Sequence, residues 1–219
     1  MQSESSPQKV EYDTHAIERE ANVLFKPNTG PQTEFLAAPE REVLYGGSAG
    51  GGKSYAMLAD PLRYMGHPAF SGLLLRHTTE ELRELISKSQ ELYPKVWPGI
   101  KWSERKMQWT APSGARLWMS YLDRDDDVMR YQGLAFSWIG FDELTQWPTP
   151  YAWNYMRSRL RSTAPDLDVY MRATTNPGGP GHGWVKKMFI DPAPYDTSFA
   201  ATDIETGEAL KYPAGHSKA

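Results

Sequence analysis

The most specific chemical signal in the sequence is a glycine-rich segment, Gly47-Ser48-Ala49-Gly50-Gly51-Gly52-Lys53-Ser54. Its spacing fits the pattern G-x-x-x-x-G-K-[ST], which is typical of loops that bind nucleotide phosphates. Small residues let backbone N–H groups come close to phosphate oxygens, and a following helix presents its positive end to them. We expect the whole segment to bind a nucleotide, with Lys53 at the β- and γ-phosphates and Ser54 on Mg²⁺.

Two acidic residues, Asp142 and Glu143, follow a buried strand that we expect over residues 136–141. The carboxyl end of such a strand is the sheet edge at which ligands bind. We expect Asp142 to hold Mg²⁺ through water and Glu143 to polarise the attacking water as a general base. The adjacent pair favours an ATPase with its catalytic glutamate beside the metal-binding aspartate. The alternative is a solvated acidic pair that opens a helix, where acids are favoured.

A third polar segment, Thr174-Thr175-Asn176, ends another expected strand over residues 168–174. A polar side chain there could sense the γ-phosphate through water and relay its presence to moving parts. An asparagine before Pro177 is also an ordinary way to start a turn, and the spacing alone leaves both interpretations open.

Four short apolar segments predict strands, at residues 42–46, 72–76, 136–141 and 168–174. Helical patterns lie around them, at residues 32–38, 53–65, 78–92 and 150–160. Strands that alternate with helices indicate an α/β fold with a mainly parallel central sheet flanked by helices. Residues 101–121 alternate polar and apolar side chains around a Pro-Ser-Gly turn, which predicts an inserted β-hairpin or meander.

The length of 219 residues, 40% of them hydrophobic, is enough for one substantial domain with flanking arms. We expect a polar arm and a helix over residues 1–26, the phosphate-loop ATPase domain over 27–190, and a linker or tail over 191–219. No apolar run approaches the ~18 residues that suggest a membrane span. The absence of cysteine excludes disulfides and thiolate zinc sites.

With these segments in hand, the sequence resembles the large terminase subunit of tailed bacteriophages, the ATPase that packages DNA into capsids. The resemblance covers residues 27–190 and rests on YGGSAGGGKS (45–54), RYQGLAFSWIGFDELTQW (130–147), RSRLRS (157–162) and TTNPGGPGHGWVKKMFI (174–190). It implies a RecA-like fold of the ASCE type, ATP and Mg²⁺ as cofactors, and ATP-driven translocation of double-stranded DNA into a procapsid.

The resemblance also implies partners and a location. They are the portal protein of the procapsid, a small terminase subunit, and further copies of the chain in a homo-oligomeric ring, pentameric by the family pattern. The place of action would be the cytoplasm of the bacterial host, with no membrane involved. The net charge of −3 gives no support for DNA binding, so local basic residues are the candidates for DNA contact, namely Lys186, Lys187 and the loop 101–106.

Carried over by position, the resemblance assigns Thr175 and Asn176 to the coupling motif and makes Gln32 the glutamine that reads the adenine edge. The alternative for Gln32 is an exposed helix residue. Arg130 falls where family members can place an arginine that acts on the ATP of a neighbouring subunit, and a guanidinium there would stabilise transition-state charge. Its competitors for that role are Arg124, Arg157, Arg159 and Arg161.

Two departures from the family are visible. Many members carry an arginine inside the phosphate loop, where this sequence has Ser48-Ala49, so a cis arginine is in doubt. Residues 191–219 are too few for the family's nuclease domain, so we expect no DNA cleavage. The acidic run Asp123–Asp127 is expected to be a solvated loop. The alternative functions are a helicase- or recombinase-like DNA-dependent ATPase, a small-molecule kinase, and an assembly module locked by nucleotide.

Overall fold

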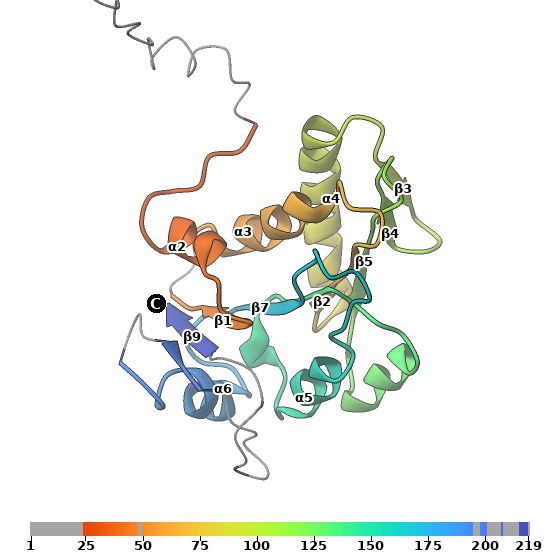
Figure 1. Cartoon of the computed structure of the whole chain (residues 1–219). Helices are drawn as coiled ribbons and strands as arrows, with labels where there is room; N and C mark the ends of the chain where they lie inside the picture. The colour runs from red at the N-terminus through yellow and green to blue at the C-terminus, as the bar shows by residue number, and fades with distance from the viewer. Residues whose placement is uncertain (1–23, 48–49, 195–197, 201–206, 208–214, 219) are drawn as a thin grey trace, which may run out of the picture.

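The computed structural model describes residues 24–47, 50–194, 198–200, 207 and 215–218 of the chain. Within these residues, nine strands form one sheet in the order β3-β4-β5-β2-β6-β7-β1-β9-β8 (Figure 1). The strands are β1 (Glu42–Tyr45), β2 (Ser71–Arg76), β3 (Lys101–Ser103), β4 (Gln108–Thr110), β5 (Arg116–Tyr121), β6 (Trp138–Phe141), β7 (Tyr170–Thr174), β8 (Ser198–Phe199) and β9 (Gly215–Lys218).

The centre of the sheet is parallel, as the sequence predicts. Adjacent strands from β5 through β2, β6, β7 and β1 to β9 all pair in parallel. β1 and β6 are buried along their whole length, and β7 is too. Burial on both faces explains why these strands read as continuous apolar runs rather than as alternating patterns.

Helices cover both faces of this sheet. They are α2 (Pro31–Ala37), α3 (Lys53–Ala59), η1 (Asp60–Tyr64), α4 (Thr79–Val96), η2 (Asp125–Tyr131), η3 (Leu144–Gln146), α5 (Tyr151–Arg157) and α6 (His182–Phe189). Figure 1 shows α2, α3 and α4 on one side of the strands and α5 and α6 on the other. Successive side chains of β2 accordingly enter two separate cores, with Leu74 in one and Leu73 and Leu75 in the other.

Helix α4 begins at the expected cap. The Thr78 hydroxyl accepts from the Glu81 N–H, and the Glu81 carboxylate accepts from the Thr78 N–H. The helix runs past the expected end at residue 92 and includes Pro94. Its last turn is retained because Tyr93 is fully buried, packs against Trp109 and donates its hydroxyl to the Leu58 carbonyl. Tertiary packing therefore overrides the proline signal.

The helix after the phosphate loop differs from its expected span of 53–65. α3 ends at Ala59 and continues as the 3₁₀ helix η1, which has Pro61 near its start. The cause is a buried polar network rather than periodicity. The Asp60 carboxylate accepts from the Trp138 indole at 2.8 Å and pairs with Arg63 at 2.7 Å, and both contacts hold the chain at this bend.

The inserted β-hairpin or meander expected over residues 101–121 is confirmed as an antiparallel meander of β3, β4 and β5, and β5 joins the main sheet beside β2. Two further segments differ from the sequence-based expectations. The acidic run starts the helix η2 at Asp125 instead of forming a loop. The expected tail contributes β8 and β9, and β9 pairs with β1. The sequence of β9, Gly-His-Ser-Lys, contains no apolar side chain, so no hydrophobic pattern marks this strand.

The polar arm and the helix expected over residues 1–26 lie almost entirely outside the described residues. In the part of the chain that the structure describes, no helix has the length and apolar character needed to cross a membrane.

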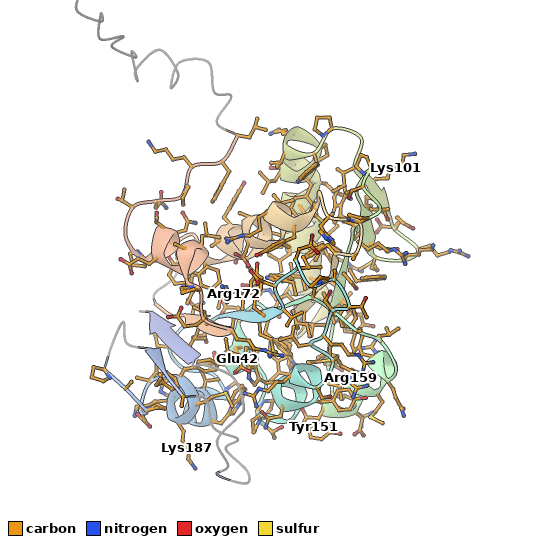
Figure 2. All side chains as sticks on the ribbon, viewed as in Figure 1. Glu42, Lys101, Tyr151, Arg159, Arg172 and Lys187 are labelled. Atoms are coloured by element: carbon orange, nitrogen blue, oxygen red, sulfur yellow. The ribbon has the colours of Figure 1, made fainter. Side chains whose placement is uncertain are left out.

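A buried ion pair joins the first strand to a helix on one face of the sheet. Arg157 donates from Nε to one oxygen of the Glu42 carboxylate at 2.6 Å and from Nη2 to the other at 2.9 Å. Glu42 is 1% exposed and Arg157 is 9% exposed. Figure 2 shows Glu42 at the start of β1, inside the molecule, above α5.

Arg157→Ala should lower the free energy of unfolding by about 3–5 kcal/mol, because it leaves the Glu42 carboxylate buried without its cation. Urea denaturation of the variant and wild type would measure the change. Arg83→Ala, at an exposed position of α4, is the matched control and should change stability by no more than about 0.5 kcal/mol. Equal stability of the two variants would contradict the structural role of the pair.

Candidate functional site

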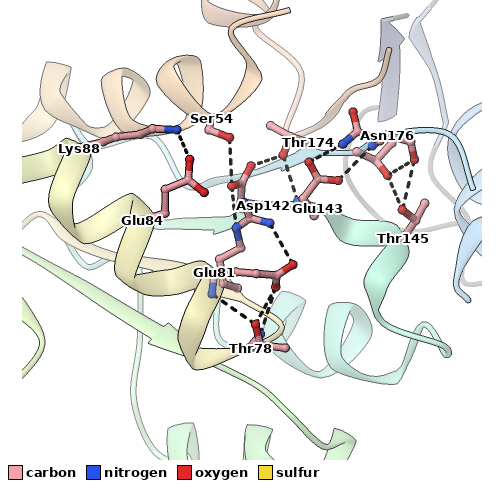
Figure 3. A network of polar contacts seen from close by, with 12 residues as sticks. Ser54, Thr78, Glu81, Glu84, Lys88, Asp142, Glu143, Thr145, Thr174 and Asn176 are labelled. Carbon is pink, nitrogen blue, oxygen red and sulfur yellow. Dashed lines mark hydrogen bonds and ion pairs between the residues drawn. The ribbon is translucent and has the colours of Figure 1, made fainter. Parts of the chain in front are cut away.

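The order of the strands gathers the predicted polar segments at one edge of the sheet. β6, β7 and β1 are adjacent and parallel, and β2 lies on the other side of β6. Their carboxyl ends therefore meet at the same edge, and the segments that follow them lie side by side. Figure 3 shows the resulting network of polar contacts.

The glycine-rich segment forms the loop between β1 and α3. Gly47, Gly50 and Gly52 have positive φ angles of 125°, 86° and 72°. The loop is tightly backed at Gly52, where an added Cβ would lie 2.6 Å from the Gln32 amide nitrogen. Only glycine combines a positive φ angle with so close an approach to Gln32 without displacing its neighbours. Ser48 and Ala49 lie outside the described residues.

Lys53 and Ser54 open α3 and face the acidic residues. The Lys53 ammonium donates to the Gly47 carbonyl at 3.0 Å. Burial lowers the pKa of Lys53, and the carboxylates of Glu143 and Asp142 oppose that shift. The Ser54 hydroxyl donates to the Asp142 carboxylate across 3.4 Å.

Asp142 follows β6 and is completely buried. Its carboxylate accepts from the Thr174 hydroxyl at the end of β7 and from Ser54. It also pairs with Arg76 at the end of β2, with Arg76 Nε 3.0 Å from Asp142 Oδ2. Sequence reasoning missed Arg76, although its signal was present: a charged residue ends the apolar strand GLLLR, as Asp142 follows the strand WIGF.

Glu143 has a left-handed backbone, with φ of 64°. This conformation is uncommon for a residue with a side chain, and such outliers gather at functional sites. The Glu143 N–H donates to the Thr174 hydroxyl at 3.1 Å, which fixes the turn. Burial raises the pKa of Glu143, and the Asp142 charge adds to the shift, while Arg76, the Asn176 N–H and Lys53 oppose it.

The segment after β7 contacts Glu143 directly. The Asn176 side-chain amide donates to one carboxylate oxygen at 2.8 Å, and the Asn176 backbone N–H donates to the other at 3.2 Å. The Thr175 hydroxyl lies 2.8 Å from the Thr145 hydroxyl on η3. The structure thus brings Asn176 into contact with Glu143 and Thr175 into contact with Thr145, so that the segments expected at the ends of two strands lie side by side.

Gln32 lies behind the phosphate loop and is 4% exposed. Its amide nitrogen donates to the Gly52 carbonyl at 2.8 Å, and its oxygen accepts from the Asn28 N–H at 2.6 Å. The alternative of an exposed helix residue is therefore wrong. Contact with adenine stays a prediction.

A cavity of about 300 Å³ lies against the loop. Its lining combines the residues discussed above with two that the sequence analysis did not single out, Tyr55 and Lys88. The complete lining is Gly50, Gly51, Gly52, Lys53, Ser54, Tyr55, Lys88, Glu143 and Asn176. Nothing in the sequence marked Lys88, since only the packing of α4 brings it to this edge.

The Ser54 hydroxyl, which lines the cavity, and the buried Asp142 carboxylate that it contacts suit Mg²⁺ bound together with phosphates. Mg²⁺ is usually held by one or two protein oxygens, with substrate phosphates and water as its other ligands. The Ser54 hydroxyl and the Asp142 carboxylate supply that number. No group of three or more His, Asp or Glu residues that could hold a metal without substrate occurs among the described residues.

Arg130 does not line this cavity. It lies in the last turn of η2, its side chain is 45% exposed, and it donates to the Tyr121 carbonyl at 2.7 Å. Of its competitors, Arg157 is committed to Glu42, and Arg159 lies over the Tyr155 ring. The DNA-contact candidates are widely separated: Figure 2 shows Lys101 by β3 and Lys187 on α6, at opposite ends of the molecule.

A family model described as "Terminase large subunit, T4likevirus-type, N-terminal" matches residues 44–212. No curated protein matches the sequence.

Solved structures share the fold. A mutant of the large terminase ATPase domain of Thermus phage P74-26 has 15% sequence identity and a TM-score of 0.59, over 89% of this chain and 81% of that chain. The large terminase of a thermophilic bacteriophage, in complex with ADP, has 20% identity and a TM-score of 0.58, over 75% and 42% of the two chains. The packaging motor assembly of bacteriophage Phi-29 has 16% identity and a TM-score of 0.50, over 84% and 56%. The expected RecA-like α/β fold is confirmed.

Thr174→Val should lower the free energy of unfolding by about 1–3 kcal/mol. The buried Thr174 hydroxyl donates to Asp142 and accepts from the Glu143 N–H, and valine can form neither hydrogen bond. Equilibrium urea denaturation checks this. Thr110→Val, the same change at an exposed site on β4, should have little effect. A Thr174 variant as stable as the Thr110 variant would show that the hydroxyl does not organise the site.

Proposed function

The chain belongs to the terminase large subunit family, T4likevirus type, whose N-terminal domain it matches, and we propose that it binds ATP with Mg²⁺ and hydrolyses it to drive double-stranded DNA into a viral procapsid. One observation carries the proposal: Lys53 and Ser54 of the phosphate loop share an edge of the sheet with Asp142 and Glu143. These are the parts that ATP hydrolysis requires, in contact with one another.

The phosphates of ATP would lie in the cavity against the loop, with Lys53 on the β- and γ-phosphates. Lys53 would exchange the Gly47 carbonyl for phosphate oxygens. Ser54 and Asp142 would hold Mg²⁺, which supplies neutralisation of phosphate charge. Arg76 would hold the Asp142 carboxylate in place and balance its charge, since it pairs with the carboxylate from the side of β2.

Glu143 would position and deprotonate the attacking water. A pKa raised by burial suits a general base, because the carboxylate then takes a proton more readily. Both of its oxygens are engaged by Asn176. We propose that the γ-phosphate alters this contact, so that Asn176 and Thr175 pass the state of the nucleotide along the 176–181 loop to α6.

Arg130 would act on the ATP of a neighbouring copy of the chain in a ring. The Arg130 side chain is exposed and does not line the phosphate-loop cavity of the same chain, which supports a role across a subunit boundary. Met129 and Leu134, each 49% exposed, lie close to it in the sequence and would be buried by such a neighbour. We keep Gln32 as the adenine-side residue, next to the loop that it supports.

We propose the portal, the procapsid and a small terminase subunit as partners of the chain. A helicase- or recombinase-like ATPase would share the site. A kinase or a nucleotide-locked assembly module would not show hydrolysis that increases with double-stranded DNA.

Glu143→Gln should reduce steady-state ATP hydrolysis by at least about 100-fold and keep nucleotide binding, because the general base is lost while the phosphate loop is intact. Hydrolysis with and without double-stranded DNA, and fluorescent ADP binding, measure the two effects. Lys53→Ala is the comparison that should lose binding. Unchanged hydrolysis by the Gln variant would remove Glu143 from the mechanism.

The pH dependence of wild-type hydrolysis follows from the same carboxylate. Glu143 acts when it is ionised, and burial raises its pKa above the ordinary value of 4.5. Activity should therefore fall as the pH decreases through that raised pKa, with its acid limb above pH 4.5. A pH–rate profile of kcat on the folded protein measures this, and an acid limb at or below the ordinary value would contradict it.

Arg130→Ala should hydrolyse ATP poorly even at high protein concentration, and activity should return on mixing with Lys53→Ala. In the mixture, one variant supplies the intact phosphate loop and the other supplies the arginine. Hydrolysis by each variant alone and by mixtures at constant total protein is the measurement. Arg159→Ala should behave as wild type. If mixing restores nothing, Arg130 does not act between subunits.

A further inference from the structure

The cavity at the phosphate loop contains a second lysine, supplied by a different element. Lys88 lies on α4, beyond the capped start of that helix, and lines the cavity together with the loop, Glu143 and Asn176. Its side chain is 34% exposed, and its ammonium donates to Glu84 at 2.6 Å. Figure 3 shows the Lys88–Glu84 pair on the side of Ser54 and Asp142 that faces away from Asn176.

The cavity has few positive charges to balance those of a bound nucleotide, so the Lys88 ammonium would add a needed cation. A nucleoside triphosphate brings several negative charges, which are spread over the γ-phosphate oxygens in the transition state. Lys53 supplies one cation, and Arg76 is already paired with Asp142. Positions 48 and 49 of the loop are Ser and Ala, which carry no charge. Of the side chains that line the cavity, Lys88 is the other cation.

The present partner of Lys88 is easily exchanged. Glu84 precedes it by one helical turn, and its side chain is 63% exposed. An exposed ion pair of this kind contributes little to stability. A phosphate oxygen in a half-enclosed cavity forms a stronger, charge-assisted hydrogen bond with an ammonium. Nucleotide can therefore displace Glu84 without destabilising α4.

The residues that share the cavity with Lys88 indicate which phosphate it would contact. Glu143 and Asn176 line the same cavity, and in the proposed function they act at the γ-phosphate. We propose that Lys88 is a catalytic residue that leaves Glu84 when a nucleoside triphosphate binds and holds the γ-phosphate oxygens in cis. It stabilises the charge that develops there during hydrolysis. This inference rests on the proposed function, since it needs a nucleotide in the cavity.

The test compares Lys88→Ala with Glu84→Gln and with Lys95→Ala, a change at an exposed lysine of the same helix. Each variant is measured for kcat and KM of ATP hydrolysis and for binding of ADP and of a non-hydrolysable ATP analogue. Lys88→Ala should lower kcat about tenfold or more and weaken the analogue about tenfold, with ADP affinity changed less than about twofold. Lys88→Arg should recover part of both losses.

Glu84→Gln distinguishes a contact of Lys88 with phosphate from a role of Lys88 in stabilising helix α4. It removes the same ion pair and leaves Lys88 free, so it should keep or increase kcat. Equal losses in Glu84→Gln and Lys88→Ala would overturn the inference, as would a Lys88→Ala variant indistinguishable from Lys95→Ala. Failure of the proposed function is a different result: wild type would bind no ADP, or Lys53→Ala would bind ADP as well as wild type.

Discussion

The buried carboxylate of Asp142 is the constraint around which this edge of the sheet is built. A carboxylate with no exposure to water is strongly unfavourable unless cations and donors surround it. Its partners come from three other parts of the chain: Thr174 from the end of β7, Ser54 after the phosphate loop, and Arg76 from the end of β2. Satisfying one charge therefore fixes four segments relative to one another.

The same requirement couples the chemistry to the fold. Thr174 links Asp142 to the backbone of Glu143, so the turn that presents the glutamate depends on the end of the neighbouring strand. Asn176 follows that strand by two residues and holds the glutamate side chain. A displacement of the segment after β7 would therefore also displace the Glu143 side chain.

The sequence predicts the strands and the polar residues that follow them, because burial on two faces gives continuous apolar runs and the acids stand out at their ends. It does not predict Lys88, which reaches the cavity only through the packing of α4, or the full length of α4, which depends on Tyr93 against Trp109. It does not predict β9 either, because the segment Gly215–Lys218 contains no apolar residue. Of the arginines in 157–161, periodicity could not show that Arg157 is committed to Glu42.

The left-handed backbone of Glu143 has a consequence for evolution and engineering. A residue with a side chain in this region is disfavoured by about 1–3 kcal/mol, whereas glycine is not. Selection for folding alone would therefore place glycine at this position, directly after the buried aspartate. Under the proposed function, the glutamate marks a trade-off in which part of the folding stability is given up for reactivity. Efforts to make a thermostable variant of this domain should leave this residue untouched.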